Sequence, residues 1–453
     1  MVGPPLRTTA RSRPFSPAEV RRALRTSMVA WGFFGSAWMA MVGGAVYVTF
    51  VRTKLHASTS VYVLVMAVPF IGALGQLLGS YLTEVVRQRR RQCLVTLTCS
   101  RALWLVAAAL PWVVPPSLPG VRIGLLLGLV LASATLSHIS NPAGFSWFAD
   151  IVPESIRARF LANRAAVSTV TVVTVSLYVS WVIQRHQSFA TFTLIFAVAG
   201  VFGLIDIWLY ALRVREPPMA PHEGPPWRMR NVWVIPSRNR PFRRYFLYVF
   251  CEAFMNGLVG PFWWLMALEF LKIGTFWANM YVMSLPMVFM AVALPFWGRV
   301  ADRVPTRTLV YIGTLSALLG PLLWVLATPR GFHPFLLVSA VVGGACWAAT
   351  QTADMSMMYS LTPRENRSAY TACLLLGGNL GLVISQLAGG QIARAFAPVH
   401  VRVGSLTLGN IHLLMLVSVL IILAHALFVI PRLPAHVEES ADAPTAKTGD
   451  EVM

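Results

Sequence analysis

Charged residues are scarce in this chain. Asp, Glu, Lys and Arg make up 12% of the 453 residues, and hydrophobic residues make up 56%. A soluble domain carries roughly 25% charged residues. A soluble fold of this composition could not cover its own surface with polar groups, so lipid must solvate much of the chain. Length alone would suggest about three soluble domains, but the long apolar runs exclude that division.

Acidic residues are scarcer than basic ones. The chain has 17 Asp and Glu against 37 Lys and Arg, and its net charge is +20. A strongly basic chain is often a nucleic-acid-binding protein. Here, however, nearly all of the positive charge lies in short loops between apolar runs. We therefore expect a lipid bilayer as the partner and no nucleic acid.

The chain also lacks the signatures of a metal centre or an enzyme. Its five cysteines have no metal-like spacing and fall in or beside the apolar runs, so they are interpreted as packing residues: Cys93, Cys99, Cys251, Cys346 and Cys373. No Ser-His-Asp, HExxH or paired-carboxylate arrangement stands at catalytic spacing, and no ATP-binding motif is present. We predict no metal site, no cofactor and no enzymatic activity.

What the chain does have is twelve apolar runs. A run of about 20 apolar residues crosses the hydrocarbon core as a helix. The first run, at about 25 residues, is too long for a signal-peptide core. The predicted spans are 28–51, 59–84, 93–115, 119–143, 163–184, 188–212, 245–270, 275–297, 308–328, 333–355, 368–392 and 405–430. The fold class is therefore an all-α multi-pass membrane protein.

A polar segment divides the spans into two sets of six. Residues 213–244 hold eight arginines and seven prolines, which predicts a loop with at most a short amphipathic helix at 227–235. At the N-terminus, Ser16 to Glu19 have the pattern of a capped helix start. The predicted segments are a basic N-terminal segment 1–27, a six-helix bundle 28–212, the central loop 213–244, a second six-helix bundle 245–430, and a disordered tail 431–453.

The distribution of Lys and Arg predicts the orientation. Alternate loops on one side, together with both termini and the central loop, hold 28 of these residues, and the loops on the other side hold 8. Cytoplasmic loops carry the excess of positive charge. Both termini and the central loop are therefore predicted to be cytoplasmic, in the cell (plasma or inner) membrane.

Two segments 210 residues apart share a pattern. The sequence DIVPESIRARF begins at Asp150, and SLTPRENRSAY begins at Ser360, so that Arg157 matches Arg367. Each segment follows the fourth span of its half. Six-span repeats related by an axis along the membrane normal occur in transporters. The repeat therefore predicts two pseudo-symmetric bundles.

The loop between the eighth and ninth spans reads Gly298-Arg-Val-Ala-Asp302-Arg303-Val-Pro-Thr-Arg307. It resembles the G-x-x-x-D-R-x-x-x-R/K signature of the major facilitator superfamily, which lies between spans two and three of each half. A glycine in this position allows close helix packing. The resemblance implies twelve helices in the fold of that superfamily.

The equivalent loop of the first half departs from this pattern. Gly79 is present, but Thr83 replaces the aspartate, and Glu84 follows it. The segment from Asp150 to Arg157 resembles the loop between spans four and five, where charged residues form pairs between the bundles. The predicted cytoplasmic gate and motif residues are Gly79, Glu84, Asp150, Arg157, Gly298, Asp302, Arg303, Arg307, Asp354 and Arg367.

In the family that the chain resembles, spans 1, 4, 7 and 10 line a central cavity. Glu252 lies about two turns into the seventh span and is the candidate for proton coupling. A carboxyl buried in a membrane is energetically costly, so its presence there indicates a function. The alternative is that Glu252 faces cytoplasmic water or pairs with a loop arginine. Asp354, in the tenth span, is expected to pair with an arginine. A kink or a break of the seventh span is expected near Gly260-Pro261, where it would expose backbone groups to a cavity.

Polar and aromatic residues of the spans are the candidates for substrate binding. His138 and Asn141 are one turn apart on the fourth span, and Asn141 matches Gln351 under the 210-residue offset. Amides on equivalent helices can hydrogen-bond a polar substrate or join helices. The cavity candidates are Trp38, His138, Asn141, Asn256, Trp263, Trp264, Gln351 and Asn379.

The function that follows from the resemblance is secondary active transport of a small solute by alternating access, with proton coupling through Glu252. We expect a monomer. No subfamily motif is present, so efflux of an amphipathic compound and uptake of a polar metabolite both remain open. The alternative is a receptor, scaffold or lipid-handling protein that has the same fold but does not transport.

Overall fold

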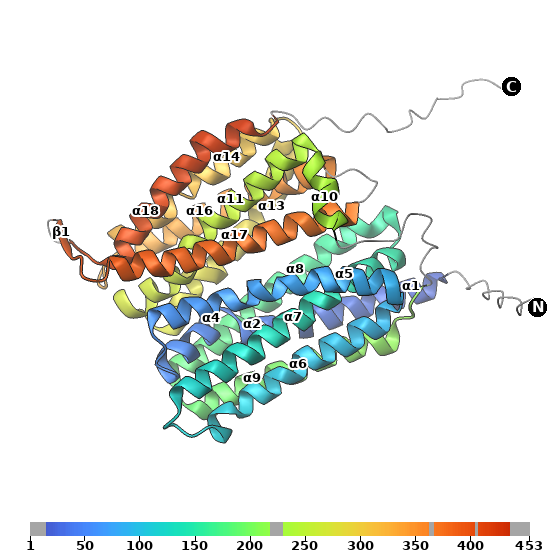
Figure 1. The fold of residues 1–453 in the computed structure, drawn as a ribbon, viewed down its shortest axis with the longest axis horizontal. Helices are drawn as coiled ribbons and strands as arrows, with labels where there is room; N and C mark the ends of the chain where they lie inside the picture. Colours follow the sequence, from blue (N-terminus) through green and yellow to red (C-terminus); the bar gives the residue numbers. More distant parts are fainter. Residues whose placement is uncertain (1–14, 218–229, 362–366, 404–405, 435–453) are drawn as a thin grey trace, which may run out of the picture.

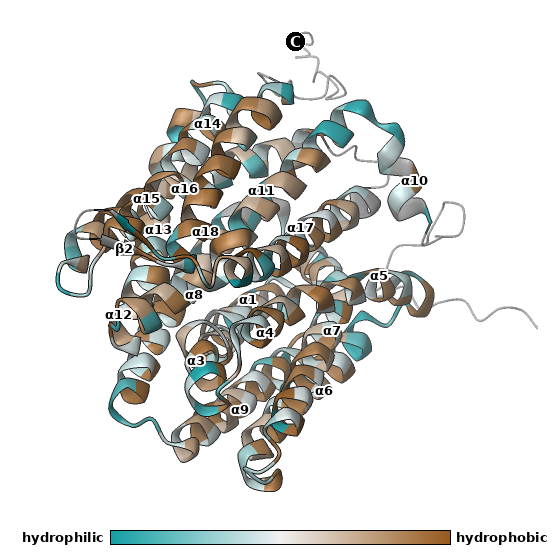
Figure 2. Cartoon of the chain, turned by 60° about the vertical axis from the view of Figure 1, so that its left-hand side comes forward, coloured by the Kyte–Doolittle hydropathy of each residue, from teal (hydrophilic) through white to brown (hydrophobic). Residues whose placement is uncertain are grey.

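The structure is a computed structural model that describes residues 15–217, 230–361, 367–403 and 406–434. These residues are almost entirely helical, and twelve helices are long and apolar enough to cross a membrane. Hydrophobic residues run along the helices, and hydrophilic residues gather at the turns and at α10 (Figure 2). The predicted fold class and the number of spans are confirmed.

The first six spans have these bounds. The elements are α1 Pro17–Ser27, η1 Met28–Gly35, α2 Ser36–Val42, α3 Gly44–Thr49, η2 Phe50–Lys54, α4 Thr59–Ile71, η3 Gly72–Leu74, α5 Gly75–Val86, α6 Arg89–Val113, α7 Pro119–Ile151, α8 Glu154–Arg185 and α9 Phe189–Arg213. Several spans are built from two or more consecutive elements, because glycines and short π-helical turns interrupt the regular helix.

The last six spans follow the short helix α10 Asn231–Arg238. The elements are α11 Arg240–Leu265, η4 Met266–Phe270, α12 Thr275–Asn279, η5 Met280–Ser284, α13 Leu285–Ala301, α14 Thr306–Ser316, α15 Leu319–Leu326, α16 Phe332–Leu361, α17 Arg367–Ala395, β1 Val401–Val403, β2 Leu406–Leu408, α18 Asn410–Ala424, η6 His425–Val429 and η7 Ile430–Arg432. The antiparallel hairpin of β1 and β2 was not predicted from the sequence.

The helix start predicted at Ser16 is confirmed. The Ser16 side chain accepts a hydrogen bond from the Glu19 amide, and Glu19 accepts one from the Ser16 amide. This reciprocal cap satisfies two amides that lack helical partners. The helix α1 leads directly into η1, so the basic segment continues the first span rather than forming a separate surface helix.

The two halves repeat one packing pattern. In the first half, α7 packs against α5 and α6, and α9 packs against α2 and α6. In the second half, α16 packs against α13 and α14 in the same way, and α18 packs against α11 and α15. Figure 1 shows the second half above the first, with α17 running alongside α4. The equivalent contacts support the repeat that the sequence indicates.

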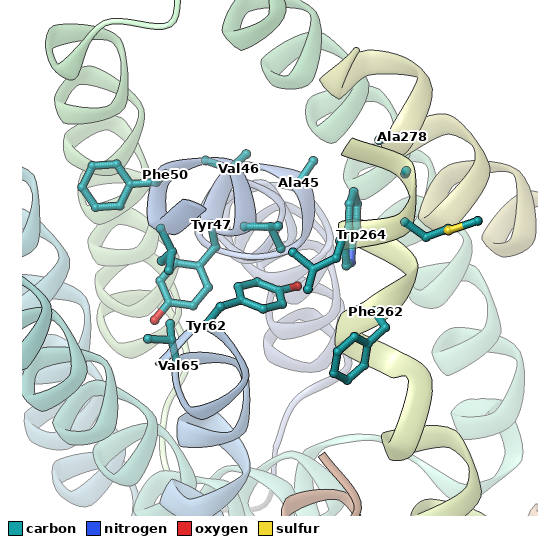
Figure 3. Packing of buried hydrophobic residues seen from close by; sticks show 14 of the residues in the cluster. Ala45, Val46, Tyr47, Phe50, Tyr62, Val65, Phe262, Trp264 and Ala278 are labelled. Atoms are coloured by element: carbon teal, nitrogen blue, oxygen red, sulfur yellow. The ribbon is translucent and has the colours of Figure 1, made fainter. Parts of the chain in front are cut away.

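Among the described residues, the halves share a large hydrophobic core at one end. That core combines Tyr47, Phe50 and Tyr62 of the first half with Phe262 and Trp264 of the second. Figure 3 shows Tyr62 between Tyr47 and Trp264, with its hydroxyl directed toward α11. Toward the other end of the helices, each half has a separate core of its own. The contact between the halves is therefore strongest at the shared core.

The seventh span has no break at the place where a kink or a break was expected, because α11 continues from Arg240 through Pro261 to Leu265. Pro261 has no amide hydrogen, so the Gly257 carbonyl one turn earlier loses its helical partner. The carbonyl of Pro261 itself accepts a hydrogen bond of 2.8 Å from the Tyr62 hydroxyl, and this bond joins the two halves.

The glycines of the two loop motifs lie in different surroundings. A Cβ at Gly79 would overlap the backbone of Ile139, because α5 lies directly against α7 at this point. A Cβ at Gly298 would meet no atom within 4 Å. Close helix packing, expected of both glycines, therefore occurs only at Gly79.

We expect Gly79→Ala to destabilise the protein and Gly298→Ala to leave it unchanged or slightly more stable. Overpacking at Gly79 costs about 1–3 kcal/mol, whereas alanine is favoured over glycine in a helix by about 1 kcal/mol. Thermal unfolding in one detergent measures both variants. Equal melting temperatures for the two would contradict the close approach of α5 and α7.

Candidate functional site

Two carboxyl groups meet inside the second half. Glu252 on α11 and Asp354 on α16 lie next to each other, with Tyr248 beside both. Glu252 is 8% exposed, and its Oε1 and the Oδ1 of Asp354 are buried without a hydrogen-bond partner among the described residues. Tyr245 donates a hydrogen bond of 3.1 Å to the backbone carbonyl of Asp354, which fixes α16 against α11 here.

No cation acts on this carboxyl pair among the described residues. The groups that influence Glu252 and Asp354 are each other and Tyr248. Two adjacent buried carboxylates repel each other, and a proton held by the pair removes that repulsion. The Tyr248 ring lies 5.5 Å from the ring of His425, whose two nitrogens are buried without partners. The arrangement can bind and release a proton inside the membrane.

The pair also corrects the prediction for Asp354. An arginine partner was expected, but in the described part of the chain Asp354 forms no ion pair. Its neighbours are Glu252 and Tyr248, which lie about one helical turn apart on α11. The sequence identified both carboxyls but did not indicate that they meet.

A second polar cluster is buried in the first half. Arg101 is 3% exposed, donates to the Ser137 hydroxyl at 2.9 Å, and places its guanidinium 3.4 Å from the centre of the Trp38 ring. Asp206 is 4% exposed and is attracted electrostatically by Arg101 and Arg164. Trp38, predicted to face the cavity, is therefore engaged inside the first half. The guanidinium attracts the indole face there.

The amide candidates differ in their surroundings. Asn141 and His138 lie on one face of α7 as expected, 3.3 Å apart from Nδ2 to Nδ1. Asn379 donates to the Leu375 carbonyl of its own helix at 2.7 Å, which satisfies one of its amide hydrogens. Asn256 and Gln351 are half-buried. Asn141 therefore has a polar partner on its own helix, and its contact with a substrate stays a prediction.

The side chains of the two adjacent tryptophans of α11 lie in different environments. Trp264 is 6% exposed and belongs to the core shared by the halves, so it is not a cavity residue. Trp263 packs edge-on against Trp324, with ring centres 5.0 Å apart, and lines a cavity inside the second half. Neighbouring residues on a helix point about 100° apart, which explains the difference.

Asp150 pairs within its own half rather than across the halves. Its Oδ2 accepts from Arg89 at 2.6 Å, and Arg89 also donates through its Nη2 to the Pro217 carbonyl at 2.8 Å. Arg89 is 1% exposed, and its backbone amide donates to Glu216. From the sequence, Arg89 was counted only as one of the loop arginines that predict the orientation, and it was not predicted as a site residue. Its burial joins the ends of α6 and α7 to the start of the central loop.

The other predicted gate residues are mostly solvated. In the described ranges, the side chains of Asp302, Arg303, Arg307 and Glu84 show no hydrogen bond or ion pair, and the first two are exposed. Thr83, in the aspartate position of the motif, donates to the Gly79 carbonyl and to Gln92. The Arg157 guanidinium donates to the Val152 carbonyl. The side chain of Arg367 lies outside the described residues.

Comparison with known protein families gives a match in the second half of the chain. The family model of the Major Facilitator Superfamily matches residues 245–449, which contain the carboxyl pair and the Gly298 motif. No curated protein matches the chain. The match agrees with the twelve helices that are long and apolar enough to cross a membrane.

Solved structures of major facilitators share the fold over nearly the whole chain. The nucleoside transporter NupG is 11% identical, with a TM-score of 0.63, over 91% of this chain and 98% of that one. A D-xylose–proton symporter is 15% identical, with a TM-score of 0.70, over 93% and 99%. A bacterial homologue of the human lysosomal transporter Spinster, inward-facing and occupied, is 14% identical, with a TM-score of 0.66, over 93% and 97%. At these identities the likeness concerns the fold.

Proposed function

We propose that this protein is a major facilitator, and that it is a proton-coupled secondary transporter that moves a small solute by alternating access. The observation that carries the proposal is the pair of Glu252 and Asp354, buried together without a cation. The two carboxyls come from different helices, so gain or loss of a proton changes the force between α11 and α16. That change supplies the coupling between a proton gradient and helix movement.

The contacts between the halves support an inward-facing conformation. The polar contacts that join them accompany the shared core: Arg52 to Glu269 at 2.5 Å, the Phe276 amide to Gln184 at 2.9 Å, and Asn279 to Ser176 at 3.0 Å. The separate cores lie toward the end with α10 and the first turn of α1. The charge distribution assigns that end to the cytoplasm.

Several finer properties belong to the same proposal. Both termini lie in the cytoplasm, and the membrane is the plasma or inner membrane. The segments are the two bundles 28–212 and 245–430, the central loop 213–244 and the two terminal segments. The transporter acts as a monomer, catalyses no chemical reaction and binds no nucleic acid. The predicted site residues are the ones to test for substrate contact and gating.

Transport by the purified protein in liposomes tests the proposal. An imposed pH gradient is expected to drive accumulation of at least one solute from a panel of neutral, cationic and anionic metabolites and drugs. A protonophore is expected to abolish the accumulation, because it removes the gradient without touching the solute. If no solute of a broad panel moves, with or without the gradient, the non-transporting alternative holds instead.

A further inference from the structure

A cavity of about 400 Å³ is lined by residues of the second half, and the η5 part of its wall lies against α8 of the first half. It is bounded by α11, by η5 and the start of α13, by α14 and α15, and by α16. This volume lies in the range of pockets for small molecules, roughly 300–1,000 Å³. Of the cavity residues, the sequence had singled out only Trp263.

Aromatic rings and thioethers dominate the wall of this cavity. The ring and sulfur side chains are Trp263, Tyr281, Met283, Met287, Met290, Trp324 and Trp347. Tryptophan faces stack on flat ring systems, and methionine sulfur makes favourable contacts with aromatic rings. Such a wall recognises a ligand through ring contacts and not through charge.

Three hydroxyl groups of the wall already have partners. Ser339 accepts from the Trp324 indole at 3.2 Å, and Ser316 donates to the Gly313 carbonyl at 2.7 Å. The Tyr281 hydroxyl is bonded to His333 at 2.8 Å. None of the described residues that line the cavity is charged. A charged ligand would lose its hydration here without a counter-charge, which is costly inside a membrane.

The cavity and the carboxyl pair lie along the same faces of two helices. Glu252 and Trp263 are eleven residues apart on α11, which is about three turns, so they share a face about 16 Å apart along the axis. Asp354 and Trp347 are seven residues apart on α16, which is about two turns and again one face. A shift of α11 against α16 that follows protonation of the pair therefore changes the shape of the cavity.

We propose that this cavity is a binding site for an uncharged, flat aromatic molecule, which is the class of substrate that the transporter carries. The inference rests on the proposed function only in naming the ligand a substrate. The binding itself is a property of the cavity. Gly343 offers direct access to it, since a Cβ there would meet no atom within 4 Å. A larger side chain at this position enters the cavity without displacing a neighbour.

The test uses the full-length protein in nanodiscs and 6-bromo-2-naphthol as the probe. Its bromine quenches tryptophan fluorescence on contact. We expect saturable quenching with the wild type. We expect Gly343→Leu to raise the dissociation constant at least about tenfold, because the leucine fills part of a cavity of this size. Gly128→Leu, a glycine of the fourth span that also faces open space, is the matched control and should bind as the wild type does.

Competition defines the ligand class. Unlabelled 2-naphthol should displace the probe. 2-Naphthoate and N,N,N-trimethyl-2-naphthylammonium should not, and neither should decanol, which represents a lipid chain. Displacement by either ion or by decanol overturns the assignment to a neutral aromatic. Equal affinity of Gly343→Leu and wild type overturns the site. Binding that persists while all gradient-driven transport fails would leave the site standing and remove the proposed function alone.

Discussion

Glu252→Gln abolishes gradient-driven accumulation of the transported solute and leaves exchange of solute across the membrane in place. Glutamine resembles the protonated carboxyl in shape but cannot release a proton. Asp354 then has no second carboxylate beside it, so the pair no longer needs a shared proton to remove the repulsion, and the gradient has no coupled proton site to act on. Exchange needs only the movement of the loaded carrier and therefore continues.

The measurement compares accumulation under an imposed pH gradient with counterflow at equal pH, in the same liposomes. Accumulation should fall to the level seen without a gradient, while counterflow stays within about twofold of the wild type. Asp354→Asn should behave in the same way, and Glu252→Asp should keep part of the coupling because a carboxyl remains. Full coupling in Glu252→Gln would show that the proton binds elsewhere.

Arg101 and Asp206 attract each other inside the first half without forming an ion pair, and Arg164 also acts on Asp206. Removal of either charge is expected to cost up to about 3–5 kcal/mol, because the other buried charge is then less well compensated. Both groups are almost completely buried, at 3% and 4% exposure. We therefore expect Arg101→Met and Asp206→Asn each to lower the melting temperature strongly. The Trp38 ring cannot replace the lost carboxylate, because a cation–π contact is worth only about 1–2 kcal/mol.

The double variant distinguishes pairing from simple loss of packing. Arg101→Met with Asp206→Asn should lose less stability than the two single changes together, since the second change removes the charge that the first left unpaired. Arg185→Met, at an exposed arginine near the end of α8, should change stability by about 0–1 kcal/mol. Additive losses in the double variant would show that Arg101 and Asp206 act independently.

The features that the sequence predicted well are local ones. Twelve apolar runs gave twelve spans because a helix in lipid must satisfy its own backbone, so hydropathy alone identifies it. The cap at Ser16 and Glu19 was predictable for the same reason, since it lies within four residues. The β-hairpin at Val401 to Leu408 was missed, because it stands in a short loop whose residues continue into an apolar run.

The features that the sequence could not supply depend on contacts between distant segments. Glu252 and Asp354 are separated by 102 positions. The position of a span in the order of the fold predicts that it lines a cavity, but it does not predict which face of the helix points toward that cavity. The same uncertainty misplaced Trp38 and Trp264, which point into packed regions. A stronger signal was present in the tyrosines: Tyr245 and Tyr248 precede Glu252 on neighbouring positions of one helical face.

The described parts of the central loop are fixed to different halves. Arg89 holds the chain at Glu216 and Pro217 to the first half, and α10 packs on α17 of the second. Only the stretch between Pro217 and Arg230 connects the two anchors. At about 3.3 Å for each residue, it reaches roughly 43 Å when fully extended. The loop thus acts as a tether of fixed length, which sets an upper limit on how far the cytoplasmic ends of the two halves can separate.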